Sequence, residues 1–169
     1  MRTIFTITLI LFSINISAQD KSELNTKENF YSFSANVGLA LAKDNYGESL
    51  NFDITKTFDD KNTTLGLNFT YATIIRKNDE PNYNLLKYSL LAGNEFSKNK
   101  SFKFEIKYGL SILDFKDYEI KKAILGVDAG LLMSYNLAGS MYINLGATSN
   151  FNKETSIFMQ SFLGFKFII

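Results

Sequence analysis

The feature that most constrains this chain is a strict alternation of apolar and polar side chains in the stretch SFKFEIKYGLSIL, residues 101–113. The even-numbered side chains from Phe102 to Ile112 are all apolar or aromatic, whereas the odd-numbered ones from Ser101 to Ser111 are polar, charged or glycine. Successive side chains of a β-strand point to opposite faces, so this stretch predicts one strand with an apolar face and a polar face. It is also longer than a typical globular strand of about 5–6 residues.

The same alternation recurs along the chain from residue 30 to residue 169. Short polar stretches separate the segments, and the two-residue period, which argues against helices, holds through each of them. Eight consecutive strands with short connections indicate an all-β fold, an eight-stranded antiparallel up-and-down β-barrel. The predicted strands are 30–43, 46–58, 62–76, 83–96, 101–114, 121–135, 140–151 and 155–169.

Glycine indicates which face of this barrel points inward, because most glycines share the polar side of their strands. Glycine weakens a strand unless close packing requires the space, and an eight-stranded barrel has an interior just wide enough for side chains to fill it. We therefore expect small and polar side chains in the lumen and the apolar face against lipid, which makes the barrel transmembrane. The inward glycines are Gly38, Gly66, Gly93, Gly109, Gly126, Gly130, Gly146 and Gly164, while Gly47 and Gly139 are predicted in connections.

Two further patterns favour lipid on the outside. The charges on the apolar side, such as Glu48 and Lys56, fall near strand ends, where a lipid-facing charge is least costly. Aromatic residues gather at the ends that carry the predicted turns 59–62, 97–100 and 136–139, which are periplasmic in an outer-membrane orientation. The predicted aromatic girdle consists of Tyr31, Phe58, Phe96, Phe102, Tyr135 and Phe167.

The N-terminus has the pattern of a secretory signal peptide. A cationic start at Arg2 precedes an apolar run over residues 4–14, and the small residue Ala18 stands where a signal peptidase would cut. A membrane anchor is the weaker interpretation, because a spanning helix needs roughly 20 apolar residues. The sequence therefore predicts a signal peptide over 1–18, a short periplasmic lead-in over 19–29 and a barrel domain over 30–169, located in the outer membrane.

Composition excludes several functions. The chain has no Cys and no His, so it has no disulfide, no thiolate or imidazole metal site and no Ser-His-Asp triad. Without residues 1–18, whose one charged side chain is Arg2, it has 17 basic and 17 acidic residues, a balance that gives no support for nucleic-acid binding. We expect no cofactor.

From residue 30 onward the chain resembles the small eight-stranded outer-membrane barrels of the OmpA/OmpX type. The resemblance rests on the strand count, the signal peptide and the closing strand SIFMQSFLGFKFII. In that family an alternating apolar C-terminal strand ending in an aromatic residue is the signal for the barrel-insertion machinery. This implies that Leu163, Phe165, Phe167 and Ile169 form the insertion signal, although the last residue is Ile rather than Phe. Enzymatic small barrels such as lipid A deacylases rely on His, so the absence of His in this chain counts against an enzymatic member of the class.

The polar side of the strands contains a balanced set of charges that we expect in the lumen. They form either a salt-bridged plug or an ion or solute path, and the narrow interior favours the plug. The spacing of the turn after Phe96 predicts Glu95 opposite Lys103 and Gly93 opposite Glu105, and the next hairpin predicts Lys107 beside Asp128. The predicted lumen network is Asp53, Lys87, Glu95, Lys103, Glu105, Lys107, Asp128 and Lys166.

Several alternatives to a closed, non-catalytic membrane barrel remain. A secreted lipocalin-like barrel would place the apolar face inward around a ligand. A Ser-Lys dyad is formally available because Ser89 and Lys87 share the inner face, and KDNYGE over 43–48 faintly resembles a calcium loop without its ligand spacing. We interpret the protein as a non-enzymatic outer-membrane barrel with a structural or interaction role. Its expected partners are outer-membrane lipid, the barrel-insertion machinery and a neighbouring membrane protein. A narrow channel or small-molecule binder is the alternative.

Overall fold

The computed structural model describes residues 29–58, 62–76, 81–99, 101–116, 123–153 and 155–169. Every boundary of the eight predicted strands is confirmed to within three residues. The predicted signal peptide and all but the last residue of the predicted lead-in lie outside the described residues. The strands are β1 (Phe30–Ala42), β2 (Asn45–Phe58), β3 (Thr63–Ile75), β4 (Tyr83–Asn99), β5 (Phe102–Lys116), β6 (Ala123–Ala138), β7 (Met141–Asn152) and β8 (Ser156–Ile168).

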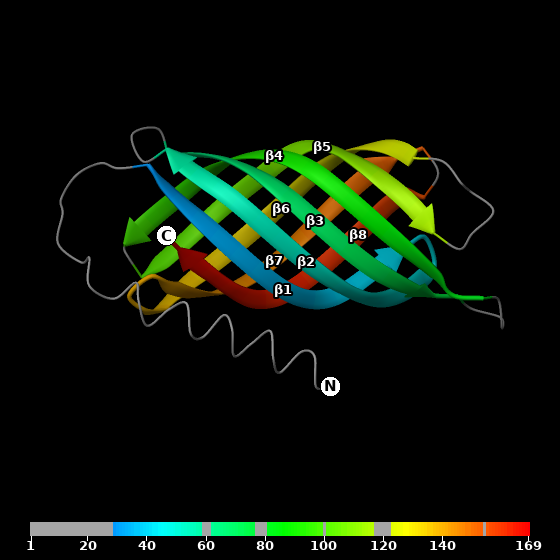
Figure 1. Ribbon diagram of the computed structural model, residues 1–169, viewed down its shortest axis with the longest axis horizontal. Coiled ribbons are helices and arrows are strands. Elements are labelled where there is room, and N and C mark those ends of the chain that lie inside the picture. The colour runs from blue at the N-terminus through cyan, green and yellow to red at the C-terminus, as the bar shows by residue number, and fades with distance from the viewer. Residues whose placement is uncertain (1–28, 59–61, 77–80, 100, 117–122, 154) are drawn as a thin grey trace.

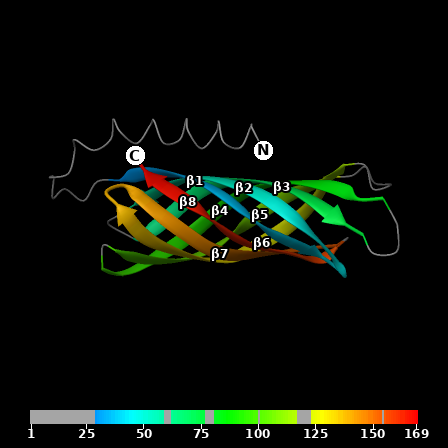
Figure 2. The ribbon, with the colours of Figure 1, turned by 90° about the horizontal axis from the view of Figure 1, so that it is seen from below.

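The strands form one closed barrel in which each strand pairs antiparallel with the next and β8 pairs with β1. Figures 1 and 2 show the strands inclined around a long, narrow barrel. The start of β1 and the end of β8 lie at one end, together with the connections at 59–62, 100–101 and 139–140; we call this the terminal end. The other end carries the connections at 43–44, 76–82, 117–122 and 153–155; we call it the loop end. The predicted up-and-down topology is thus confirmed.

The apolar face of the barrel points outward. In β5, for example, Glu105 and Lys107 are 2% and 9% exposed, whereas Ile106 and Tyr108 are 40% and 51% exposed. The same alternation runs through all eight strands and produces a belt of exposed Leu, Ile, Val, Phe and Tyr side chains. An apolar band on the outside is the mark of a transmembrane barrel, so the lipocalin-like alternative is wrong. Over the described residues, no helix is long and apolar enough to cross a membrane.

The inward glycines make room for larger lumen side chains. A Cβ atom on Gly146 would lie 2.6 Å from the Phe162 ring, and one on Gly126 would lie 2.5 Å from the Asn150 amide nitrogen. Gly47 differs from the prediction, because it lies inside β2, paired with Ala40 and Ile74, rather than in a connection. A Cβ atom there would lie 1.9 Å from the Thr73 carbonyl oxygen, so close strand packing requires glycine at this position.

The predicted register of two hairpins is wrong by two residues. The β5–β6 ladder is regular, so a bulge is not the cause of its shift. In the β4–β5 hairpin, β4 continues past its predicted end to Asn99 and contains an irregularity between Ser97 and Asn99. A bulge adds residues to one strand without changing the alternation pattern enough to be seen in the sequence. The observed pairs are Glu95 with Glu105, Gly93 with Lys107, Phe96 with Phe104 and Lys107 with Gly130.

Candidate functional site in the barrel lumen

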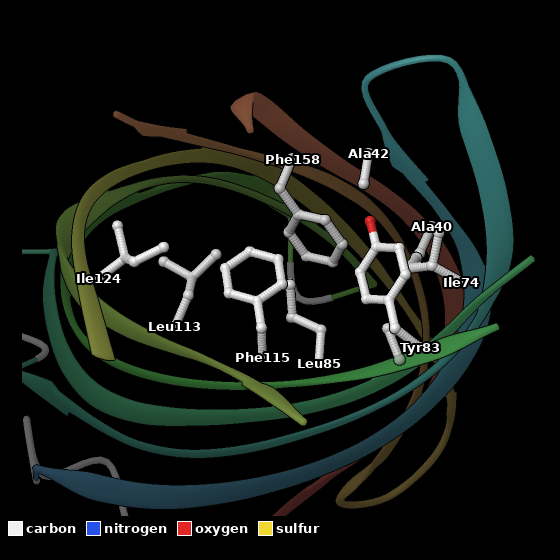
Figure 3. Close-up of a cluster of buried hydrophobic side chains, with 10 residues drawn as sticks. Ala40, Ala42, Ile74, Tyr83, Leu85, Leu113, Phe115, Ile124 and Phe158 are labelled. Carbon is white, nitrogen blue, oxygen red and sulfur yellow. The ribbon is translucent and has the colours of Figure 1, made fainter. Parts of the chain in front are cut away.

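The lumen has an apolar half at the loop end, which the sequence analysis did not anticipate. Ten buried apolar residues on six strands point into the barrel there, and Figure 3 shows their side chains facing one another across the lumen. We call this group the apolar cap. It consists of Ala40, Ala42, Ala72, Ile74, Tyr83, Leu85, Leu113, Phe115, Ile124 and Phe158.

The apolar cap is tightly closed. Ile74, Leu85 and Leu113 are fully buried, and the rings of Tyr83 and Phe115 pack with their centroids 6.0 Å apart. The expectation that only small and polar residues face inward is therefore wrong for this end. The physical reason is that a narrow lumen has to be filled, and apolar side chains fill it without needing hydrogen-bond partners.

The remainder of the lumen, toward the terminal end, is mainly polar and charged, with the apolar residues Leu91, Leu132, Tyr142 and Phe162 buried among the polar ones. The structure places all eight residues of the predicted lumen network inside the barrel. Seven of them are buried, and the Lys103 side chain is 13% exposed beside the terminal end. They come from β2, β4, β5, β6 and β8, so five strands contribute charge to one compartment.

Most of the charges are paired across strands that are not neighbours. The Lys87 ammonium on β4 lies 3.5 Å from the Asp128 carboxylate on β6. The Lys107 ammonium on β5 lies 3.7 Å from the Asp53 carboxylate on β2. The predicted pair between Lys107 and Asp128 is therefore wrong, because the actual register places Gly130 beside Lys107.

Glu105 is the centre of the network. Its carboxylate lies 3.8 Å from the Lys107 ammonium on the same strand and 3.9 Å from the Lys166 ammonium on β8. The Thr64 hydroxyl on β3 also donates to Glu105. Glu105 on β5 is thus linked directly to β3 and β8, and it is linked to β2 through the ion pair between Lys107 and Asp53.

The predicted ion pair between Glu95 and Lys103 is present even though the two residues are not directly opposite. The Lys103 ammonium donates to the Glu95 carboxylate at 2.8 Å across a diagonal of the β4–β5 ladder. It also lies 4.9 Å from the centroid of the Phe30 ring and 5.6 Å from that of the Tyr142 ring. This group closes the lumen at the terminal end.

Side-chain amides, which the sequence analysis did not single out, complete the polar half. Asn150 donates to Asp128 at 2.7 Å and to Ser111 at 2.6 Å, and Asn68 donates to Asp53 at 3.0 Å. These residues lie on the same inward parity as the charges, so the alternation pattern was sufficient to find them. Further hydrogen bonds cross the lumen, from Asn144 on β7 to Ser34 on β1 and from Thr70 on β3 to Gln160 on β8.

Very little space is left inside this network. The cavity between Asp53, Lys87, Lys107 and Asp128 has a volume of about 10 Å³. A water molecule needs about 10–15 Å³ by the same measure, so this cavity is at the lower limit for one water. The space between these four charged side chains is therefore almost completely filled.

The structure does not assemble the other candidate sites. Lys87 is paired with Asp128, and the Ser89 hydroxyl has no hydrogen-bond partner in the described part of the chain, so the two do not form a dyad. In KDNYGE, Lys43 and Asp44 form a two-residue turn and the remaining residues belong to β2. Within the described residues, no group of acidic side chains could hold a metal ion.

Comparison with known proteins places this chain by its fold. No protein-family model matches the sequence, and no curated protein matches it either. Among solved structures, the Neisserial surface protein A (NspA) is 12% identical with a TM-score of 0.64, and the match covers 83% of this chain and 98% of that one. The N-terminal β-barrel domain of Pseudomonas aeruginosa OprF is 17% identical with a TM-score of 0.60, covering 85% of this chain and 100% of that one.

A third match is the outer membrane enzyme PagL, at 15% identity and a TM-score of 0.55, covering 82% of this chain and 99% of that one. Because one of these structures is an enzyme, the shared architecture does not by itself decide the activity. This chain is similar to these proteins in architecture and has the fold of the small eight-stranded outer-membrane β-barrels.

Proposed function

We propose that this protein is a non-enzymatic integral barrel of the outer membrane that is closed to ions and serves a structural or interaction role in the cell envelope. The observation that carries this proposal is the filled lumen, with the apolar cap at one end and the paired charges in the rest. A barrel without a continuous water path can contact other molecules through its outer wall, its rim and its connections, but it cannot conduct ions through its lumen.

Outer-membrane placement is supported by the outer surface. The six aromatic residues of the predicted girdle all point outward near the terminal end, as the interfacial girdles of such barrels do. The connections at the loop end are on average longer than those at the terminal end, which agrees with an extracellular loop end. The signal-peptide pattern of residues 1–18 supports export.

The absence of enzymatic activity is supported by the residues available for chemistry. The chain has no His and no Cys. Lys87, the lysine of the Ser89–Lys87 pair considered as a dyad, is held by Asp128. Among the described residues, neither a His-activated or Cys nucleophile nor the Ser89–Lys87 dyad is therefore available.

The C-terminal strand supports assembly by the barrel-insertion machinery. Leu163 and Phe165 are exposed on the outer wall of β8, and Phe167 follows them on the same face. Ile169, beyond the end of β8, exchanges backbone hydrogen bonds with Tyr31 and so completes the closing seam with β1. We include these four residues in the proposal as the insertion signal.

Conductance measurements test the proposal. Purified protein in planar lipid bilayers should give no large, stable conductance, because the cap and the ion pairs leave no continuous water path. A triple variant, Leu85→Ser/Leu113→Ser/Phe115→Ser, which shortens the cap, is the positive control and should raise the frequency of current steps. Reproducible ion-selective currents of the unaltered protein that disappear on substitution of Lys107 or Asp128 would instead support the narrow channel.

A further inference from the structure

The outer wall over β1 to β6 has a concavity within the apolar belt, with a volume of about 640 Å³. Its borders are two successive rows of outward side chains in the strand register, and the strand segments at Asn68, Ser89 and Ser111 form its floor. We call it the aromatic groove. One row is Phe33, Ile54, Leu67, Leu90 and Leu110, and the other is Phe52, Phe69, Tyr88, Ile112 and Leu125.

Rigid aromatic rings form one part of the border. Ring centroids are 6.4 Å apart for Phe33 and Phe52, 6.5 Å for Phe52 and Phe69, and 5.3 Å for Phe69 and Tyr88. Phe52 and Phe69 lie near the middle of their strands, whereas aromatic residues of membrane barrels concentrate at the two interfaces. Near the middle of β6, β7 and β8, by contrast, the outward residues Ala129, Ala147 and Ser161 are small.

The dimensions of the groove fit an extended hydrocarbon chain. It crosses six strands, and five spacings of about 4.8 Å give a length of about 24 Å. Register rows run perpendicular to strands that tilt by about 35–45° in such barrels, so the groove rises by about 16 Å through the membrane. This is close to one leaflet, which is about half of a 30 Å hydrocarbon core.

A cation, Lys56, stands at the terminal end of the groove. Lys56 is two residues beyond Ile54 on the same outward face of β2, and it is two residues before the strand ends at Phe58, at interfacial depth. Its ammonium lies 5.4 Å from the centroid of the Tyr31 ring and 5.1 Å from that of Phe58. In the described part of the chain no carboxylate forms an ion pair with Lys56, so the charge is available to an external anion.

We propose that the aromatic groove binds an anionic phospholipid of the leaflet at the terminal end. The lipid phosphate pairs with Lys56 between the Tyr31 and Phe58 rings, and one acyl chain lies in the groove along Phe33, Phe52 and Phe69. The charge of Lys56 and the apolar lining of the groove match the two parts of one amphipathic ligand. This inference rests on the proposed membrane location and adds a specific lipid to it.

Photo-crosslinking tests this site. The full-length mature chain is refolded into phosphatidylcholine vesicles that contain a trace of phosphatidylglycerol with a diazirine in one acyl chain. We expect cross-links to concentrate on peptides that contain Phe52, Phe69 and Tyr88 and to be sparse on the outer wall of β7 and β8, which contribute no residue to the groove. Lys56→Ala should reduce groove labelling about fivefold, the factor that corresponds to about 1 kcal/mol for one surface cation near an anionic lipid.

Controls separate the charge from the groove and from folding. Lys116→Ala removes an outward cation at the loop end and should leave groove labelling unchanged, and Leu67→Trp should reduce labelling by filling the groove. Heat-modifiable migration in gels confirms that each variant is a folded barrel, so failure of the site is distinguishable from failure of the membrane proposal. Equal labelling around the whole barrel, labelling unaffected by Lys56→Ala, or cross-links between two copies of the chain at the groove would each overturn the proposal.

Discussion

The two halves of the lumen are filled by side chains of opposite chemistry, apolar at the loop end and mainly polar and charged toward the terminal end. At the loop end, Leu85, Leu113 and Phe158 pack by shape and volume, and their burial does not require a hydrogen-bond or charge partner on a particular strand. Toward the terminal end, each buried charge needs a particular partner on a particular strand, as Lys107 needs Asp53. Apolar burial therefore supplies stability, whereas the paired charges make wrong strand arrangements costly, because a mispaired strand leaves a buried charge alone.

The largest effect is expected from breaking one buried pair in the charged half. Lys87→Met leaves the Asp128 carboxylate buried without its cation and should lower the free energy of unfolding by about 3–5 kcal/mol. The double variant Lys87→Met/Asp128→Asn has no unpaired charge and keeps an oxygen to accept from Asn150. It should recover most of the loss in urea denaturation from lipid vesicles, followed by circular dichroism.

If the double variant is as unstable as Lys87→Met alone, the comparison fails, because the loss would then come from packing rather than from an unpaired charge. A double variant close to the unaltered protein would mean that this pair contributes little net stability and serves the choice of strand partners.

A smaller loss is expected in the apolar half. Leu113→Ala creates a cavity in the cap and should cost about 2–4 kcal/mol in the same assay. Ile112→Ala, on the outward face of the same strand, is the matched control and should cost less, because a lipid chain can move into the space. Equal losses at positions 112 and 113 would argue against a cap that is closed and dry.

The smallest effect is expected at the terminal end, where the Lys103 and Glu95 side chains are less deeply buried than those of Lys87 and Asp128. Glu95→Ala and Lys103→Ala should each destabilise the barrel, and the double variant should lose less than the sum of the two. We expect a coupling free energy of up to about 1 kcal/mol, the range for cross-strand and partly exposed ion pairs. Strict additivity in a double-mutant cycle would show that the 2.8 Å contact between these two side chains is energetically silent.

The alternation of residues was enough to predict the strands and the outward direction of the apolar face, because a two-residue period has a direct geometric meaning in β-structure. It was also enough to identify the eight charged lumen residues. The positions of the glycines then indicated which face of the strands points into the barrel, because a side chain at Gly126 or Gly146 would clash with Asn150 or Phe162 in the lumen.

The apolar cap was not predicted because each strand was assigned one apolar face, the face on which most of its apolar residues lie. The signal was present as neighbouring apolar pairs near the loop end, such as Ile74–Ile75, Leu85–Leu86 and Ile112–Leu113, which place one apolar residue on each face. The predicted ion-pair partner of Lys107 was wrong for a different reason. Contacts such as Lys107 with Asp53 depend on the barrel diameter and on irregularities at 97–99, neither of which a single strand's sequence reveals.

The most direct test of this account is the accessibility of spin labels on β5. In this cysteine-free chain, Ile106→Cys carries a label on the outer wall, and Lys116→Cys carries one on the same face at the loop end. In lipid vesicles the label at 106 should be relaxed by lipid-soluble oxygen and shielded from a water-soluble nickel reagent, while the label at 116 should respond to nickel. A label at 106 that is inaccessible to both reagents, or that responds to nickel as strongly as the label at 116, would contradict a barrel whose apolar wall faces lipid.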